Sequence, residues 1–417
     1  MSEISDMIQR LCPDGVEYRK IKDVVKSIST GLNPRKNFKL NTSDSDNYYV
    51  TVKEFTSGKI IFNDKTDRIS DEAVSIIQNR SKLEYNDILL SGIGTIGKVA
   101  LVNIPVGNWN CSESVFLLKP IIDIIQPKFL VYILQGNEVQ NVWINECVGS
   151  TLKGIRKTTL ENLEIPVPPL EVQRKIVEVL DNFSELTAEL TAELEARKKQ
   201  YEYYRDNLLN FSQIAPPNSV KWMKMSELGT FTRGRRFVRA DIVEQGYPCI
   251  HYGDMYTYYG LSATETKTYI PFEVAKKLRF AQKNDVVIVG AGENDEDIGI
   301  GVAWLGDSSP AVHDACYIFH HNQNPKFISH YLRTSFYHKQ IKTSVSSGKI
   351  CSISAEGIGK ALIPIPPLAE QERIVSILDR FEALTTDLTA GLPAEIKARQ
   401  QQYEYYRDQL LTFKRSN

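Results

Sequence analysis

One long segment of this chain occurs twice, and this repeat constrains the fold more than any other sequence feature. Residues 168–211 read PPLEVQRKIVEVLDNFSELTAELTAELEARKKQYEYYRDNLLNF, and residues 366–413 read PPLAEQERIVSILDRFEALTTDLTAGLPAEIKARQQQYEYYRDQLLTF. Both copies begin with prolines, which a helix tolerates in its first turn, and continue with strong helix formers. Each copy therefore predicts a helix far longer than those of ordinary globular domains.

The apolar residues of both copies follow alternating steps of four and three, the spacing of a coiled coil. The predicted contact residues are Ile176, Leu180, Phe183, Leu190, Leu194, Tyr201, Tyr204 and Leu208 in the first copy, and Ile374, Leu378, Phe381, Leu388, Tyr403, Tyr406 and Leu410 in the second. The second copy has one additional four-residue unit that contains Gly391 and Pro393, so we expect a kink or short break there. The alternative is a pair of amphipathic helices buried in one globule.

The segments between these copies also resemble each other. Each has an early glycine turn (Gly31 and Gly234), two β-branched runs joined through glycines, and a Pro-Lys-Phe sequence that opens a helix. We expect a lead-in at residues 1–15 that packs near the C-terminal helix, a first domain at 16–165, a long helix at 166–212, a second domain at 213–363 and a second long helix at 364–417.

The predicted fold class is α+β, with two similar mixed α/β domains separated by two long coiled-coil helices. The first helix must run from the first domain to the second, and the second helix starts at the equivalent end of the second domain. The two helices can bury their apolar faces together only if they are antiparallel. The chain is then nearly circular, with pseudo-twofold symmetry and a spacer on the order of 60 Å.

Composition excludes several classes of protein. The chain is 42% hydrophobic and 24% charged, which is ordinary for a globular protein. It contains neither an apolar run of membrane-spanning length nor the apolar core of a signal peptide, so we expect a cytoplasmic protein. The six cysteines form no CxxC pair, which argues against a zinc site or a disulfide framework.

The sequence contains no convincing catalytic or metal-binding motif. Gly92, Gly94 and Gly97 match the GxGxxG pattern of a nucleotide-binding loop, but a β-like segment follows where that loop requires a helix. A hairpin is therefore expected instead. His313 and Cys316 could in principle ligate a metal, although a structural role explains them better. We predict no catalytic residues, no metal ligands and no cofactor in this chain.

Basic residues near glycine turns, with aromatic residues nearby, are the candidates for DNA contact. Arginine can donate paired hydrogen bonds to guanine, while lysine binds phosphate. The alternative for any one of them is a solvated basic face. The candidates are Arg35, Lys36, Lys98 and Lys153 in the first domain, and Arg233, Arg235, Arg236, Tyr252 and Lys349 in the second.

Together these features resemble the DNA-specificity subunits of type I restriction–modification systems over the whole chain. The resemblance is carried by the two Pro-Pro-Leu-x-x-Gln motifs (168–173 and 366–371), the Thr-Ala-Glu-Leu quartets (187–194), the two Tyr-Glu-Tyr-Tyr-Arg-Asp motifs (201–206 and 403–408) and residues 11–16. The chain departs from the pattern in having two quartets in one copy and three in the other.

The resemblance implies two target-recognition domains, each reading one half of a split, asymmetric site in double-stranded DNA. It implies helices that act as a spacer and dock two modification (methyltransferase) subunits, with restriction (translocase and nuclease) subunits joining through the complex. S-adenosylmethionine, ATP and Mg are expected on those partners. The alternatives are a self-contained DNA methyltransferase or nuclease, and a coiled-coil scaffold without a DNA role.

Overall fold

The computed structural model describes residues 2–146, 154–211, 220–386 and 391–416. The chain folds as two compact units. The first comprises Met1–Glu189 together with Lys397–Asn417, and the second comprises Leu190–Ile396. Within the described residues, no helix is both long and apolar enough to cross a membrane.

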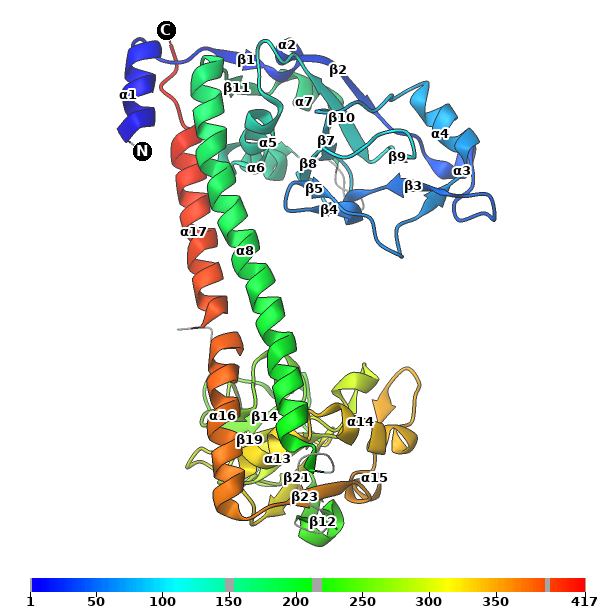
Figure 1. Ribbon diagram of the computed structural model, residues 1–417, viewed down its shortest axis with the longest axis vertical. Coiled ribbons are helices and arrows are strands. Elements are labelled where there is room, and N and C mark those ends of the chain that lie inside the picture. The colour runs from blue at the N-terminus through cyan, green and yellow to red at the C-terminus, as the bar shows by residue number, and fades with distance from the viewer. Residues whose placement is uncertain (1, 147–153, 212–219, 387–390, 417) are drawn as a thin grey trace. The chain divides into compact units, whose positions relative to one another are not determined.

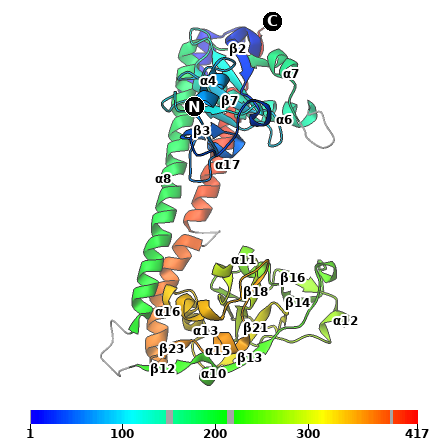
Figure 2. The same cartoon turned by 90° about the vertical axis from the view of Figure 1, so that its right-hand side faces the viewer.

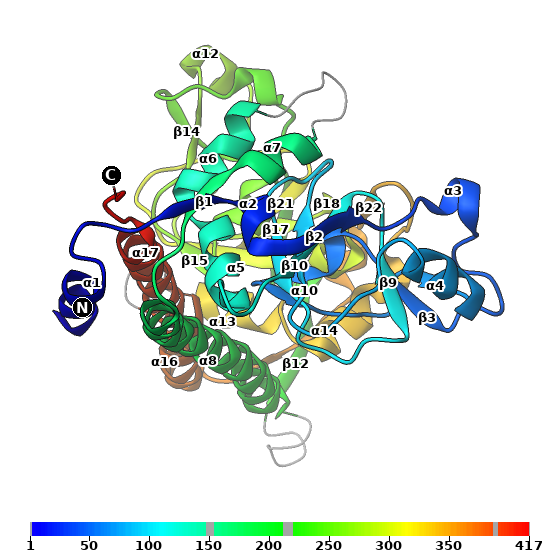
Figure 3. The same cartoon turned by 90° about the horizontal axis from the view of Figure 1, so that it is seen from above.

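The first unit is built on a four-stranded sheet in the order β2-β10-β7-β8, with all neighbours antiparallel. A second sheet, β6-β3-β9, lies with α3 and α4 on the side of the unit away from the long helix (Figure 3). Its helices are α1 (Ser2–Leu11), α2 (Ile21–Val24), α3 (Pro34–Asn37), η1 (Val52–Glu54), α4 (Asp71–Gln78), α5 (Pro127–Gln135), α6 (Asn137–Glu146) and α7 (Lys157–Asn162). Its strands are β1 (Tyr18–Lys20), β2 (Val25–Thr30), β3 (Asn47–Val50), β4 (Phe55–Thr56), β5 (Lys59–Ile60), β6 (Arg68–Ile69), β7 (Ile88–Ser91), β8 (Val99–Leu101), β9 (Trp109–Cys111), β10 (Val115–Pro120) and β11 (Glu164–Pro166).

The second unit repeats this plan, with the main sheet in the order β13-β21-β17-β19-β15 and a smaller sheet β16-β14-β20. Its helices within the domain are α10 (Met225–Leu228), η2 (Arg239–Asp241), α11 (Asp254–Thr257), α12 (Phe272–Ala275), η3 (Asp295–Asp297), α13 (Pro325–Tyr331), α14 (Ser335–Ile341), η4 (Lys342–Ser344) and α15 (Ala355–Gly359). Its strands are β12 (Lys221–Lys224), β13 (Gly229–Arg233), β14 (Tyr247–Ile250), β15 (Ser262–Ala263), β16 (Thr268–Ile270), β17 (Val286–Val289), β18 (Ala291–Gly292), β19 (Gly301–Trp304), β20 (Ala311–Val312), β21 (Cys316–His321), β22 (Cys351–Ser352) and β23 (Leu362–Ile365).

The glycine-rich segment Gly92–Gly97 forms the turn of a β-hairpin, as predicted. β7 and β8 pair antiparallel, with Ile88 opposite Leu101, and β17 and β19 pair in the same way in the second unit. The first glycine run leads into β8, and the second leads only to the three-residue 3-10 helix η3 before β19, so neither provides the strand–loop–α-helix context that a phosphate-binding loop needs. The predicted helices after the two Pro-Lys-Phe sequences are also confirmed, as α5 and α13.

The first repeated segment forms one continuous helix, α8 (Leu170–Leu209), and the second forms α16 (Leu368–Thr386) and α17 (Leu392–Leu411). Figure 1 shows α17 alongside α8 in the first unit and α16 alongside α8 in the second, antiparallel in both, as expected for this fold class. Pro393 lies in the first turn of α17, where its missing N–H costs no helical hydrogen bond. The break predicted at Gly391 and Pro393 agrees with the structure, in which Gly391 lies in a bend and α17 begins at Leu392; residues 387–390 lie outside the described part of the chain.

Aromatic pairs join these helices at the predicted contact positions. Phe183 packs against Tyr406 in the first unit, with ring centroids 5.5 Å apart, and Tyr204 packs against Phe381 in the second at 5.3 Å. The contact positions nearest the domains are the most deeply buried: Ile176, Leu180, Ile374 and Leu378 are at most 1% exposed. Of the other predicted positions, Leu190, Leu194, Tyr201, Leu208 and Tyr403 are half-buried, Leu410 is buried, and Leu388 lies outside the described residues.

The glutamine of each Pro-Pro-Leu-x-x-Gln motif joins the long helix to its domain. Gln173 is fully buried; its Oε1 accepts the N–H of Gln126 (2.8 Å), and its Nε2 donates to the carbonyls of Pro168 (2.7 Å) and Ile124 (3.0 Å). Gln371, also fully buried, accepts the N–H of Asn324 and donates to the carbonyl of Pro366. Gln126 and Asn324 are the N-caps of α5 and α13, so each glutamine fixes the helix that supports the domain.

The Arg-Asp pair that ends each Tyr-Glu-Tyr-Tyr-Arg-Asp motif makes a second attachment. Asp408 accepts hydrogen bonds from the backbone N–H (3.3 Å) and side-chain amide (2.6 Å) of Asn137, at the start of α6. In the second unit Asp206 accepts the N–H of Ser335, at the start of α14 (3.2 Å). The preceding arginines are buried and donate to these aspartates, which orients the carboxylates towards the helix N-termini.

We predict that Gln173→Ala lowers the free energy of unfolding of the first unit by about 2–4 kcal/mol. It leaves one N–H and two carbonyls without partners, and each such buried group costs about 1–3 kcal/mol. Urea unfolding followed by tryptophan fluorescence would measure the change. The control is Glu171→Ala, at an exposed position of the same helical turn. Equal stability of the two variants would contradict the assigned role of the glutamine.

Candidate nucleic-acid interface

An equivalent glycine fixes the start of one loop in each unit. A Cβ atom on Gly31 would lie 1.7 Å from the carbonyl oxygen of Cys111, and one on Gly234 would lie 2.2 Å from that of His313. Neither glycine has a positive φ, so the requirement is close approach of two backbones rather than an unusual conformation. The loops at residues 32–37 and 235–238 therefore leave the two domains from equivalent places.

Two of the three predicted arginines of the second loop have structural partners. Arg233 donates from Nε to the carbonyl of Asp314, and Arg235 donates to the carbonyl of Lys277, both at 2.8 Å. Arg236 is exposed and makes no hydrogen bond or ion pair with any described residue. The side chain of Arg239, at the start of η2, is also exposed and makes no hydrogen bond or ion pair with the described residues, although Arg239 was not among the predicted DNA contacts. Arg236 and Arg239 are therefore the guanidinium groups that can engage a ligand without breaking an internal contact.

An aromatic and histidine cluster lies under this loop. Phe237 is buried and packs edge-on against His313, with ring centroids 5.0 Å apart, and the carbonyl of Phe237 lies 3.1 Å from Nε2 of His313. The rings of Tyr252 and His251 each lie 5.1 Å from that of His313. The structure thus brings the predicted residue Tyr252 to the arginine loop, although sixteen residues separate it from Arg236 in sequence. The packed aromatic and imidazole rings of this cluster support the loop.

The equivalent loop of the first unit carries different side chains. Lys36 is exposed on α3, and the side chain of Arg35 is outside the described part of the structure. Asn33 donates to Glu113, and the Tyr49 hydroxyl donates to the carbonyl of Leu32 at 2.7 Å, so the loop is attached to the small sheet. The sequence of this loop, Leu-Asn-Pro-Arg-Lys-Asn, thus differs from the Arg-Arg-Phe-Val of the second loop.

The remaining predicted residues lie on other loops. Lys98 is exposed in the β7–β8 hairpin, and Lys349 is exposed just before β22. No contact joins Lys98 to Lys36, or Lys349 to Arg236, among the described residues. Lys153 lies outside them. These assignments remain predictions.

One further candidate for DNA contact in the first unit, the pair of Arg68 and Tyr48, is evident only from the tertiary structure. Arg68 lies over the ring of Tyr48 at 3.9 Å, and Tyr48 in turn stacks on Phe62 with centroids 4.1 Å apart and planes 2° apart. Pairing of β3 with β6 places Tyr48 opposite Arg68. The only sequence signal was an arginine and a tyrosine in two short β-like runs, which does not reveal their register.

The two repeated helical segments each carry an exposed tyrosine at the same position of the motif. Tyr203 is 66% exposed and Tyr405 is 61% exposed, at the third position of the two Tyr-Glu-Tyr-Tyr-Arg-Asp motifs. The tyrosine at the fourth position, Tyr204 or Tyr406, faces the partner helix, and the aspartate at the sixth position binds the domain. The tyrosine at the third position is thus a large side chain present in both copies without a comparable internal role.

Comparison with known proteins gives consistent matches. Residues 13–197 and 217–398 each match the family described as the type I restriction modification DNA specificity domain. The chain is 33% identical to the type I restriction enzyme EcoR124I/EcoR124II specificity subunit of Escherichia coli, over 65% of this chain and 69% of that one. It is 34% identical to the putative specificity subunit S.HindORF215P of Haemophilus influenzae, over 62% of this chain and 66% of that one.

Two solved structures share the fold. One comes from work on complex assembly and conformational transition of the type I R-M system, with a TM-score of 0.62, 17% identity, and coverage of 95% of this chain and 97% of that one. The other is the type I restriction-modification S subunit from M. genitalium, with a TM-score of 0.51, 16% identity, and coverage of 95% and 96%. At these identities the likeness concerns the fold alone.

All six histidines lie in the second unit, so any pH dependence of stability that comes from histidine arises there. Burial lowers the pKa of His251 and His313 in the loop cluster, and lowers the pKa of His321 to about 4. The unfolded chain therefore binds protons below about pH 6.5 that the folded unit does not bind until lower pH. The free energy of unfolding should fall as the pH decreases from about 6.5 to 4.

His321 alone should account for on the order of 2 kcal/mol at pH 5, because each pK unit corresponds to about 1.4 kcal/mol. Urea unfolding at pH 7 and pH 5 would measure this. The comparison is His321→Asn, which can still accept the N–H of Gln323 but does not titrate in this range. An unchanged pH dependence in that variant would contradict the assignment.

Proposed function

The chain belongs to the family of the type I restriction modification DNA specificity domain, and we propose on that basis that it reads a split DNA site for a methyltransferase and nuclease complex. Each of its two units would contact one half of the site in double-stranded DNA. The modification subunits, and through them the restriction subunits, would bind to the same chain. This assignment agrees with the roles named for its relatives.

The observation that supports the proposal is a pair of equivalent loops, one in each unit, at residues 32–37 and 235–238. The two units share one fold, but these loops carry different side chains. Gly31 and Gly234 pin the two loops by the same backbone contact, whereas the side chains that follow differ. Residues 32–37 include one arginine and one lysine, whereas residues 235–238 include two arginines. Arginine donates bidentate hydrogen bonds to guanine, and lysine binds phosphate or a single acceptor. Such a pair of loops suits two unlike half-sites, so the target should not be palindromic.

The chemistry would belong to the partners. We propose that this chain is non-catalytic, and that S-adenosylmethionine, ATP and Mg bind to the modification and restriction subunits. Because its ligand is DNA, the protein would act in the cytoplasm. A self-contained methyltransferase is disfavoured because the glycine-rich segment forms a hairpin turn.

The exposed tyrosines of the long helices are the best candidates for docking the modification subunits. Tyrosine is enriched at protein interfaces, since it buries a large apolar ring and keeps a polar end. Tyr203 and Tyr405 occupy equivalent positions in the two copies, which fits one modification subunit on each.

We predict that Arg236→Ala weakens binding of the assembled complex to its DNA site about 5- to 150-fold. A guanine contact by arginine contributes about 1–3 kcal/mol of discrimination, and a phosphate contact would reduce the salt dependence instead. Selection of bound sequences from random duplexes, followed by titration at two salt concentrations, would distinguish these contributions. In the selected sequences, base preference should decrease only in the half-site that the second unit contacts.

The matched control is Lys360→Ala, an exposed cation of the same unit that is ion-paired with Glu356. Arg233→Ala serves as a comparison, because that arginine holds a carbonyl and should act mainly through the loop structure. Loss of sequence information in both half-sites, or in neither, would refute the division of the site between the two units.

A separate prediction concerns assembly. Tyr203→Ala and Tyr405→Ala should each reduce binding of the modification subunit, and the double variant should reduce it further. Analytical ultracentrifugation of the mixed subunits would measure the stoichiometry. Glu202→Ala and Glu404→Ala, at the neighbouring exposed positions, are the controls. Full assembly by the double tyrosine variant would place the docking surface elsewhere.

A further inference from the structure

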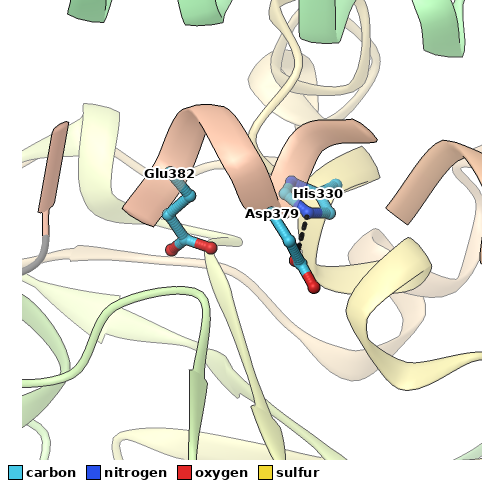
Figure 4. A group of neighbouring side chains, drawn as sticks. All are labelled: His330, Asp379 and Glu382. Atoms are coloured by element: carbon cyan, nitrogen blue, oxygen red, sulfur yellow. Dashed lines mark ion pairs between the residues drawn. The ribbon is translucent and has the colours of Figure 1, made fainter. Parts of the chain in front are cut away.

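A buried histidine and two carboxylates meet where α13 packs against α16 in the second unit. His330 comes from α13, and Asp379 and Glu382 come from α16 (Figure 4). One potential ligand atom from each residue lies within 4.8 Å of those of the other two. Figure 2 shows α13 between α16 and the sheet of the domain, so the group lies at the attachment of the domain to its helix.

Two of these atoms face each other without a hydrogen-bond partner. His330 is 0% exposed, and neither its Nε2 nor Oδ1 of Asp379 makes a hydrogen bond. The two atoms are 3.6 Å apart, which is too long for a hydrogen bond. Two ligands of a tetrahedral metal centre with bonds of about 2.0–2.1 Å lie roughly 3.4 Å apart. The separation is therefore that of two ligands around a metal ion.

The surrounding groups hold these atoms in place. The Tyr201 hydroxyl lies 3.0 Å from Nδ1 of His330, so it can fix the tautomer that leaves Nε2 with a free lone pair. Lys326 binds the other carboxylate oxygen of Asp379 at 2.7 Å. The N–H of Leu261 donates to Oε1 of Glu382 at 3.0 Å. A second shell of this kind is typical of histidine and carboxylate ligands.

In the first unit the equivalent aspartate, Asp181, has partners for its carboxylate, and neither a histidine nor a glutamate occupies the equivalent positions. Lys128 and Asp181 form the same ion pair there, at 2.6 Å, but Tyr132 occupies the position of His330 and donates to Asp181 at 2.6 Å. Ser184 occupies the position of Glu382. In the first unit, therefore, the aspartate accepts a short hydrogen bond from Tyr132. In the second unit, both Tyr132 and Ser184 are replaced by residues that can bind a metal.

We propose that His330, Asp379 and Glu382 bind one divalent cation of the zinc class in the second unit. One imidazole nitrogen and two carboxylates favour Zn²⁺, Co²⁺ or Ni²⁺ over Mg²⁺, which prefers oxygen ligands alone. Lys326 and the half-buried Arg333 lie near the same carboxylates, so binding should be weaker than at a structural zinc site.

The cation would tie the second domain to its long helix. α13 supports the main sheet of the unit, and α16 belongs to the helical pair, so one ion would join the two. Since the first unit has Tyr132 and Ser184 at these positions, only the second unit would gain stability from the cation.

The test is titration of the full-length chain, freed of metal by a chelator, with Co²⁺ and with Zn²⁺. Visible absorption reports the ligand field of Co²⁺, and the absence of a sulfur-to-metal charge-transfer band excludes binding at the cysteines. Calorimetry with Zn²⁺ gives the stoichiometry. The variants are His330→Tyr, which copies the first unit, and Asp379→Asn; the control is Glu372→Gln, exposed on α16.

We expect one equivalent of cation per chain, at least tenfold weaker binding in both variants, and unchanged binding in the control. Zn²⁺ should raise the unfolding temperature of the parent protein but not that of His330→Tyr. Absence of saturable binding at millimolar Zn²⁺, or binding that the variants leave intact, would overturn the proposal. If His330→Tyr does not fold, as judged by circular dichroism, Glu382→Ser provides the decisive comparison, since Ser184 is native in the first unit.

Discussion

In each unit, the hydrogen bonds of one buried glutamine attach the domain to its long helix. Gln173 and Gln371 sit one turn into the long helices and bind the N-caps of α5 and α13. Those helices pack against the sheet of their own domain, α5 on β8 and α13 on β19, so the glutamines connect the long helices to the two sheets. An amide is well suited to this place because it both accepts and donates, and can satisfy an N–H and a carbonyl together.

The Arg-Asp pairs add a second point of attachment, and two points fix an orientation where one would permit rotation. Asp206 and Asp408 lie more than thirty residues beyond the glutamines along the repeated segment, yet each contacts the helix that follows α13 or α5 in its unit. In the first unit the glutamine comes from α8 and the aspartate from α17, and in the second unit from α16 and α8. Each domain is therefore held by both members of an antiparallel pair, which explains why the motifs occur twice.

Identical attachments leave the rest of each domain free to differ. The glycine contacts at Gly31 and Gly234 preserve the backbone of one loop, and the side chains beyond them diverge from Lys36 in one unit to Arg236 in the other. The same contrast occurs inside the units, where Tyr132 and Ser184 of the first correspond to His330 and Glu382 of the second. We propose that the differences at the exposed loops serve DNA recognition and that this buried difference affects how the second domain is held.

The heptad spacing, the glycine-bounded strands and the Pro-Lys-Phe helix starts predicted the long helices, the hairpins and α5 and α13, because these signals are local in sequence. They could not reveal that Arg233 and Arg235 bind carbonyls while Arg236 and Arg239 remain exposed, since those partners lie more than forty residues away. Nor could they pair Tyr48 with Arg68, or His330 with Asp379. Local sequence determines which elements form, but strand register and helix packing decide which side chains meet, and only the tertiary structure contains those choices.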